Sequence, residues 1–228
     1  VDVGLNTGTS LTQWAPAAAP LAGPHAHTMS ACVRSASTCY YGFEANPVFT
    51  PRLIALETSL RANGTRVKLF TRTAFNVNSQ PVTMFIEKST RAGSDGLFSD
   101  SFAQGSTLEG SKVHKFIDKS GTWRRAKGNP TVEQKHNKEI VNSMDAATFL
   151  EGLRTSSSFV ALKLDVEGFE YTLLPHLLMN APRALCGALS VLAAEWHESM
   201  VPKFQGSTDH LKWMLQHRAC NITTINWH

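Results

Sequence analysis

Short apolar runs separated by longer amphipathic segments predict alternating strands and helices. Residues 1–3, 40–44, 159–164 and 188–194 are apolar runs of strand length. The run at 159–164 is apolar at nearly every position, which is typical of a parallel strand covered by helices on both faces. The pattern therefore predicts an α/β fold with a mostly parallel sheet and helices on both faces.

Further elements follow from the same periodicities. We expect one helix that begins near Leu53 and ends at Asn63, and another that Ser143 or Asp145 caps. The other expected elements are strands at 66–70, 82–87, 140–141 and 221–227 and helices at 171–178 and 211–217. The length of 228 residues fits a single domain, 1–228, with one sizeable core. Because the first residues already lie in a strand, we expect this domain to be excised from a longer chain.

Two segments interrupt the alternation and predict insertions at about 15–38 and 88–138. The first carries three prolines within 15–25, which an uninterrupted helix does not accommodate. The second is polar, and its part at 112–138 holds eight basic side chains against two acids. This charge indicates either a solvated loop or a surface that attracts an anionic partner. A single tryptophan among these residues is thin support for base stacking, so we do not expect nucleic acid as the partner.

The first apolar run leads into a glycine turn. Gly4 allows this turn to close without a Cβ, and Gly8 allows the chain to approach a ligand at the start of a helix. A buried strand, a glycine turn and a helix start together form the usual ligand-binding unit of such folds. Asn6 stands where a dinucleotide fingerprint has its second glycine, so the turn alone is a weak signal.

Charged side chains stand at the ends of the predicted strands. Asp2, Glu44 and Asp165 belong to three different strands, and Glu195 and His197 follow a fourth. Because the carboxyl ends of parallel strands meet at one edge of a sheet, we expect Asp2, Glu44 and Asp165 to converge there.

Three stretches together resemble the FkbM-type class I methyltransferases. They are DVGLNTG at 2–8, FEANP at 43–47 and KLDVEGFE at 163–170, in the same order as the hallmarks of that family. The resemblance covers most of the chain but not residues 11–38. It implies a Rossmann-like class I methyltransferase fold, whose full sheet has seven strands with a final antiparallel pair, and S-adenosyl-L-methionine as the cofactor.

The resemblance also implies roles for individual residues. Asp2 would reach the amino group of the cofactor, and residues 73–76 would contact its adenine. Glu44 would bind the ribose, because the two oxygens of a carboxylate can accept two hydrogen bonds from a vicinal diol. The complete expected cofactor set is Asp2, Gly4, Asn6, Gly8, Glu44, Ala45, Ala74 and Asp165.

Methyl transfer to an oxygen requires in-line positioning and removal of a proton. We expect His197 or Asp165 as the general base, since the ordinary pKa of histidine is near neutrality. A structurally hydrogen-bonded histidine is the alternative interpretation of His197.

Lys163 has an unusual place at the end of a buried strand. We expect it to be ion-paired with Glu167, Glu170 or Glu195, and a catalytic role is the second interpretation. Some class I O-methyltransferases hold a metal through acids at the ends of the fourth and fifth strands, and Asp165 and Glu195 could take those places. Nothing in their spacing requires a metal, so none is predicted.

The four cysteines, Cys32, Cys39, Cys186 and Cys220, show no spacing typical of a zinc site. Reduced thiols are the favoured interpretation, and a Cys32–Cys39 disulfide is the alternative.

Two Asn-x-Thr triplets, at 63–65 and 221–223, would accept glycans if the chain entered the secretory pathway. No apolar run approaches the ~20 residues of a membrane-spanning helix. The oligomeric state stays open at this point, and so does the compartment, for which the cytoplasm is slightly favoured.

These observations predict an S-adenosyl-L-methionine-dependent methyltransferase that methylates a hydroxyl of a small-molecule or glycan acceptor, with an anionic acceptor as one option. The first alternative is an NAD-dependent oxidoreductase, because Glu44 would serve the ribose of NAD equally well. The missing second glycine and the stretch at 163–170 count against it. The second alternative is a catalytically silent Rossmann-like binding module that engages an acidic partner.

Overall fold

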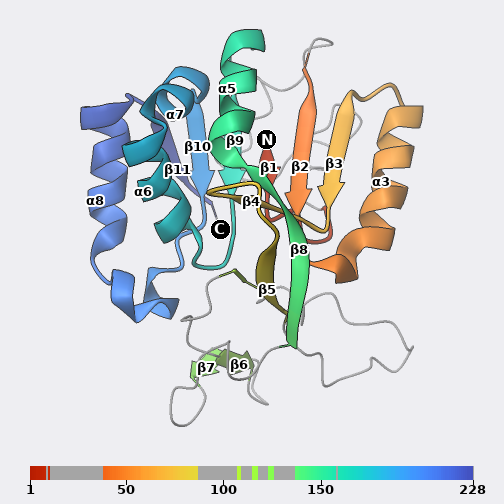
Figure 1. Ribbon diagram of the computed structural model, residues 1–228, viewed down its shortest axis with the longest axis horizontal. Coiled ribbons are helices and arrows are strands. Elements are labelled where there is room, and N and C mark those ends of the chain that lie inside the picture. The colour runs from red at the N-terminus through yellow and green to blue at the C-terminus, as the bar shows by residue number, and fades with distance from the viewer. Residues whose placement is uncertain are drawn as a thin grey trace.

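The main sheet of the protein contains six parallel strands in the part of the chain that the structure describes. The computed structural model describes residues 1–8, 10, 38–86, 107–108, 115–117, 123–125, 137–157 and 159–227. The strand order is β11-β10-β9-β1-β2-β3, and every neighbouring pair is parallel (Figure 1). The bounds are β1 (Asp2–Val3), β2 (Tyr40–Glu44), β3 (Val67–Thr71), β9 (Ala161–Leu164), β10 (Val191–Ala194) and β11 (Thr223–Asn226).

This order divides the sheet into two halves that grow outward from its centre. The first half runs β1-β2-β3 in one direction and the second runs β9-β10-β11 in the other. The strand order therefore reverses between β1 and β9. In an open parallel sheet, this point leaves a crevice outside the carboxyl ends of the strands, where ligands bind.

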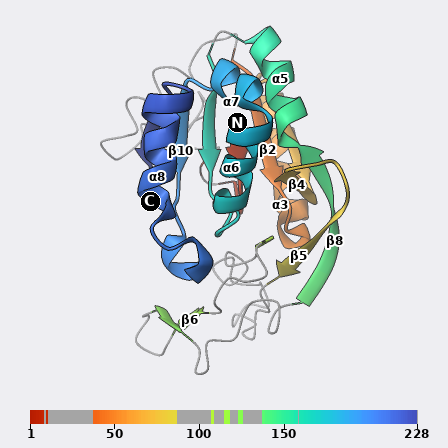
Figure 2. The same cartoon turned by 60° about the vertical axis from the view of Figure 1, so that its left-hand side comes forward.

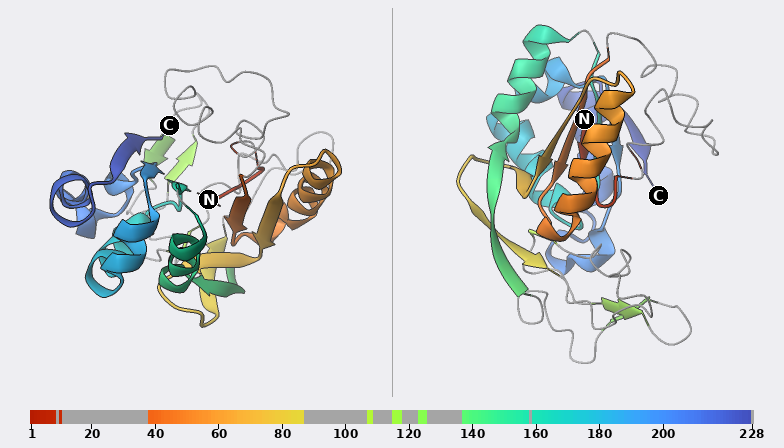
Figure 3. Two further views of the ribbon diagram at one scale, coloured as in Figure 1. Left: turned by 90° about the horizontal axis from the view of Figure 1, so that it is seen from above. Right: turned by 90° about the vertical axis from the view of Figure 1, so that its right-hand side faces the viewer.

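Helices cover both faces of the sheet. Helix α3 (Thr50–Ala62) buries Leu53 and Leu60 against Val67 and Leu69 of β3. A larger core lies on the opposite face, under α5 (Ala146–Ser156), α6 (Glu170–Asn180) and α7 (Pro182–Ala188), with α8 (Ser207–Trp213) beyond them. Figure 3 shows α3 and α5 on opposite sides of the strands. The structure thus confirms a mixed α/β fold with a mostly parallel sheet, consistent with a Rossmann-like architecture.

A smaller sheet extends past the carboxyl edge of the main one. Strands β4 (Thr73–Asn76) and β8 (Asn137–Asp145) are parallel, and β5 (Val82–Ile86) pairs antiparallel with β8 (Figure 2). The expected strand at 82–87 is confirmed as far as Ile86. The expected strand at 140–141 is part of the nine-residue β8, which begins inside the predicted insertion at 88–138. Asp145, and not Ser143, caps α5, because its Oδ1 accepts a hydrogen bond from the Thr148 N–H at 2.7 Å.

Other element boundaries differ from the predictions near the chain's end. Residues 182–188 form α7, so β10 begins three residues later than the apolar run does. Helix α8 begins at Ser207 and continues as a π-helical turn over Met214–Ala219. These shifts arise because an apolar run indicates only that its residues are buried. A buried helix face and a buried strand can both produce such a run.

The cysteines contradict the expectation of reduced thiols. Cys186 of α7 and Cys220, just before β11, form a disulfide across 34 residues of sequence. Cys39 is exposed and is a free thiol among the described residues. No spacing rule pairs two cysteines this far apart, because the fold alone brings them together.

Several predictions fall outside the described residues. These are nearly all of the insertion at 15–38, Cys32 and most of the segment at 88–138. Its described parts include the hairpin of β6 (Lys115–Ile117) and β7 (Trp123–Arg125). As for membrane insertion, none of the helices described here has the length and apolar character to cross a bilayer.

Candidate functional site

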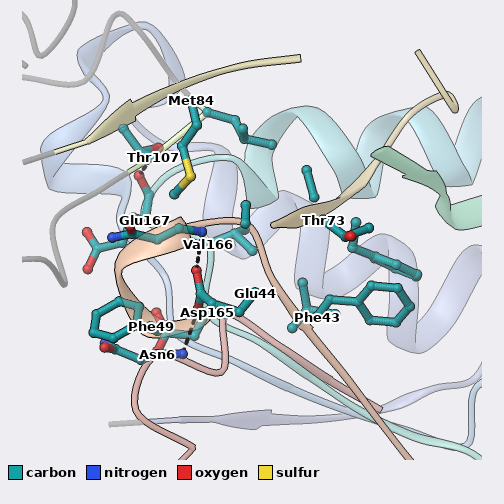
Figure 4. A pocket seen from close by; sticks show the side chains of 17 residues that line it. Asn6, Phe43, Glu44, Phe49, Thr73, Met84, Thr107, Asp165, Val166 and Glu167 are labelled. Carbon is teal, nitrogen blue, oxygen red and sulfur yellow. Dashed lines mark hydrogen bonds between the residues drawn. The ribbon is translucent and has the colours of Figure 1, made fainter. Parts of the chain in front are cut away.

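A cleft lies at the carboxyl ends of β1, β2 and β9, where the strand order reverses. Its empty space is about 570 Å³, which includes solvent at the open mouth. Figure 4 shows the side chains around it. The polar part of the lining is Asn6, Glu44, Asn46, Thr73, Thr107, Asp165 and Glu167.

Gly4 brings the first turn close to the end of β9. Its φ is +79°, and a Cβ at this position would lie 1.7 Å from the carbonyl oxygen of Asp165. Only glycine fits this contact and tolerates this backbone conformation without strain. Because Gly4 has no side chain, the ends of the two strands that form the cleft can lie this close together.

Glu44 joins the end of β2 to the same turn. Its Oε2 accepts a hydrogen bond from the Asn6 N–H at 2.7 Å, and its Oε1 accepts one from the Asn46 N–H at 2.6 Å. Burial raises the pKa of Glu44 to about 7, although both backbone hydrogen bonds oppose that rise. Each carboxylate oxygen can accept more than one hydrogen bond, so both retain capacity toward the cleft.

The remaining walls of the cleft are mostly apolar. Phe49 follows β2, Ala74 lies on β4 and Met84 on β5, and Leu108 comes from the predicted insertion at 88–138. Thr107 joins this insertion to the cleft, since its backbone pairs with Phe85 and its Oγ1 donates to the Glu167 carbonyl at 2.9 Å. Flat apolar walls beside a few polar groups are typical of small-molecule sites.

Lys163 links β9 to β1 through ion pairs. The prediction that it pairs with Glu167, Glu170 or Glu195 was wrong. Its Nζ lies 3.3 Å from Asp2 Oδ1 and 3.4 Å from Asp165 Oδ2, and it donates to the Gly4 carbonyl at 3.1 Å. Burial lowers the pKa of Lys163, but attraction to Asp2 and then to Asp165 outweighs burial and raises it overall. The prediction failed because Lys163 is paired in register with Asp2 on the neighbouring strand, whereas acids nearer in sequence lie beyond the strand end.

Glu170 holds His197 behind the cleft. This glutamate is fully buried at the start of α6, and its Oε1 accepts the His197 backbone N–H at 2.7 Å and faces His197 Nδ1 at 3.1 Å. Its Oε2 accepts the Gly168 N–H at 2.9 Å. One carboxylate thus fixes the imidazole and the turn after β9 together.

The other imidazole nitrogen faces three more carboxylates. His197 Nε2 lies 3.5 Å from Glu195, 3.7 Å from Glu167 and 4.0 Å from Asp165. Burial lowers the pKa of His197, but hydrogen bonds to Glu170 and Glu195 outweigh this and raise it to about 10. Burial also raises the pKa of Asp165 to about 6, against the pull of Lys163.

The turn after β9 points its acid into this cluster through unusual backbone angles. Glu167 has φ +55° and Gly168 has φ +103°. A non-glycine residue in the left-handed region costs on the order of 1–3 kcal/mol and tends to mark functional sites. Asp165, Glu167 and His197 offer ligand atoms within 4.8 Å of one another, a set that could hold a divalent cation.

The structure brings together most, but not all, of the predicted site. Six of the expected cofactor residues line the cleft: Gly4, Asn6, Glu44, Ala45, Ala74 and Asp165. Asp2 is turned toward Lys163 and Ser10, and a Cβ on Gly8 would meet Leu56 of α3 at 2.4 Å. Gly8 therefore fits against a helix, and neither residue is part of the lining.

Sequence reasoning missed Glu170 and Thr107 as parts of the site. Glu170 was visible as the last acid of the stretch at 163–170, but only its zero exposure reveals the buried clamp on His197. Thr107 carried no signal, since it lies in a segment without periodicity. His197 was predicted to face the cleft but lies behind the lining.

Comparison with known proteins identifies no relative of this chain. No family model, no curated protein and no solved structure matches this chain. The class that the fold and the cleft define is an α/β protein with a cleft at the switch point of a parallel sheet, the place where such folds bind ligands.

Proposed function

We propose that this protein is an S-adenosyl-L-methionine-dependent methyltransferase that methylates a hydroxyl of a small-molecule or glycan acceptor. One observation carries the proposal. The glycine turn, the Glu44 carboxylate and the Asp165–Glu167 turn, which are the three stretches that resemble FkbM-type methyltransferases, line a single cleft at the switch point.

The residues of the cleft fit an adenosyl ligand. Glu44 keeps acceptor capacity on both oxygens for the two hydroxyls of a ribose, and the walls from Phe49 and Ala74 suit a flat apolar base. The side-chain oxygen of Asn6 is buried without a hydrogen-bond partner among the described residues, so it can accept from a ligand. Gly4 lines the cleft beside these groups and adds no side chain to it.

When bound, S-adenosyl-L-methionine would supply a sulfonium methyl group for in-line attack by an acceptor oxygen, with S-adenosylhomocysteine as the leaving group and the acceptor proton passed to a base. We assign the proton to Asp165, which lines the cleft, and not to His197, whose two ring nitrogens both face carboxylates. Lys163 holds Asp165 and the Gly4 turn in place and stays protonated. These groups position the acceptor and need not form covalent bonds with it.

Thermal unfolding with added ligands tests this proposal. We expect S-adenosyl-L-methionine and S-adenosylhomocysteine, each at a hundred times its Kd, to stabilise the protein by ~2.7 kcal/mol. For a domain of this size that corresponds to a rise in Tm of roughly 5–10 °C. Glu44→Ala should abolish the rise in Tm, because it removes the carboxylate that would accept hydrogen bonds from the ribose. It also removes the hydrogen bond from the Asn6 N–H.

A matched control and the rival ligand make the outcome decisive. Glu139→Ala removes an exposed carboxylate of β8 that faces no part of the cleft, and it should keep the full ligand response. A Tm that rises only with NAD would replace the proposal with the oxidoreductase. A Tm that no adenosyl compound or NAD changes would leave the binding module as the function to pursue.

A further inference from the structure

The triplet Asn221-Ile222-Thr223 presents both of its reactive residues to solvent. Asn221 has φ +55° and is exposed, and Thr223 is exposed at the start of β11. Ile222 between them lies in the large core with an exposed fraction of 1%. Ile222 is held in the core, while the asparagine before it and the threonine after it remain exposed. A glycan on this triplet requires an exposed asparagine, because the sugar is bulky and lies on the surface.

In the triplet Asn63-Gly64-Thr65, the asparagine is exposed and the threonine is half-buried. Asn63 ends α3 and is exposed, and Gly64 follows with φ +80°. No atom lies within 4 Å of the position that a Cβ on Gly64 would take, so the turn is open on its outer side. Asn63 Nδ2 donates to the Ser59 carbonyl at 3.0 Å, and a glycosylated amide keeps one N–H for this bond.

Both triplets lie at the edge of the sheet opposite the candidate site. The first precedes β3 and the second enters β11, which are the two outermost strands of the main sheet. Because all six strands are parallel, their amino ends lie at one edge and their carboxyl ends at the other (Figure 1). The cleft lies at the carboxyl edge. Glycans at Asn63 and Asn221 would therefore leave the cleft open.

The disulfide is an independent observation that points to the same compartment. Cys186 and Cys220 are bonded, and Cys220 directly precedes Asn221. Such bonds form and persist in oxidising environments such as the secretory pathway, where N-glycans are also attached. Reduced thiols at this site would instead be expected of a cytosolic chain.

We propose that Asn63 and Asn221 carry N-linked glycans and that the chain folds with its Cys186–Cys220 disulfide in the secretory pathway. In each glycosylation, Nδ2 bonds to the anomeric carbon of a lipid-linked oligosaccharide, the carbon–oxygen bond to the lipid diphosphate breaks, and the amide loses one proton. In disulfide formation, two thiols pass two electrons and two protons to a disulfide oxidant of that compartment.

Secretion of the chain from a eukaryotic cell behind a cleavable signal peptide tests this proposal. We expect peptide-N-glycosidase to shift the wild-type protein by two steps on a gel and each of Asn63→Gln and Asn221→Gln by one. The matched control Asn78→Gln changes an exposed asparagine outside any triplet and should keep both steps. Thr65→Ala and Thr223→Ala retain the asparagines and should each remove one step, which separates lost glycosylation from misfolding of the Gln variants.

Peptide mapping without reductant completes the experiment. We expect one linked peptide pair that contains Cys186 and Cys220. A secreted, folded protein that peptide-N-glycosidase leaves unchanged would overturn the glycan sites, and a single step would overturn one of them. Recovery of Cys186 and Cys220 as free thiols from that protein would overturn the proposed disulfide. Each of these results is independent of cofactor binding.

Discussion

Gly4 shows how a single residue sets the geometry of the cleft. Its Cα lies so close to the Asp165 carbonyl that no side chain fits between the ends of β1 and β9. Gly64 has nearly the same φ, +80°, but open space around it. A comparison of alanine substitutions at the two glycines therefore separates the cost of backbone strain from the cost of close packing.

We expect Gly4→Ala to destabilise the protein by about 3–5 kcal/mol, and Gly64→Ala by about 1–2 kcal/mol. Both variants bear the strain of a left-handed alanine, and only the first adds overpacking against a backbone carbonyl. Urea unfolding of the two variants measures the difference. Equal losses of stability would show that β1 and β9 are not held in contact at this turn.

Glu44 predicts a pH dependence of stability. Its pKa in the folded protein is about 7, above the ordinary value of 4.5, so the folded state binds this proton more tightly than the unfolded state. Stability from this group is thus complete below pH 4.5 and is lost as the pH rises toward 7. A shift of this size corresponds to a loss on the order of 3 kcal/mol.

Unfolding free energies of the wild type and Glu44→Gln between pH 4.5 and 8 measure this contribution. We expect the wild type to lose stability relative to Glu44→Gln as the pH rises, because glutamine does not titrate. Asp165 also has a raised pKa and is common to both proteins, so only its repulsion of the Glu44 carboxylate enters the difference. A difference that is constant with pH would contradict the assigned burial of an ionisable Glu44.

At the scale of elements, Lys163 fastens the two halves of the sheet together. Its ammonium group on β9 neutralises Asp2 on β1 and Asp165 at its own strand end. We expect Lys163→Met to cost about 3–5 kcal/mol of stability, because two carboxylates lose their buried partner. Calorimetric or denaturant unfolding provides the measurement.

Lys68→Met is the matched control for this prediction. Lys68 is half exposed and lies 3.8 Å from Glu57, a separation typical of weak surface pairs. Its loss should change stability by no more than about 1 kcal/mol. A similar effect of both substitutions would mean that the Lys163 ion pairs do not hold β1 to β9.

Among the elements, those with a strong local signal were predicted well. Residues 40–44 formed a strand as expected, and α3 ended at Ala62 with Asn63 as its C-cap before Gly64, whose φ of +80° explains the stop. The extent of β8 was missed, because its first four residues are all exposed and show no alternation of buried and exposed positions. Its length depends on pairing with β5, which no local pattern reveals.

At the scale of the whole molecule, the disulfide links α7 to the entry of the edge strand β11. A loop of 34 residues closed in this way stabilises the folded state by about 4 kcal/mol through the entropy of the unfolded chain. We expect the double variant Cys186→Ser, Cys220→Ser to lower Tm by roughly 8–16 °C.

Cys39→Ser is the control for this prediction, because Cys39 is exposed and forms no described bond. It should leave Tm within a degree or two of the wild type, as surface substitutions usually do. A double variant that unfolds at the wild-type Tm without reductant would show that the bridge does not constrain the unfolded chain.

The sequence by itself determined the alternation of strands and helices, the glycine turn and the acids at the strand ends. These features are local, because they follow from periodicity, from backbone freedom at glycine and from residues adjacent in the chain. Glu44 and Asp165 could be assigned to one edge for this reason, and both line the cleft. The resemblance to a methyltransferase family rests on the same local stretches.

Only the tertiary structure decided which charges meet and which cysteines bond. Lys163 pairs with Asp2, 161 residues earlier, and His197 is held by Glu170, because strand register and helix packing bring them together. Cys186 reaches Cys220 for the same reason. Ion pairs and disulfides depend on distance in space, and distance in space between remote residues is set by the packing of the whole core.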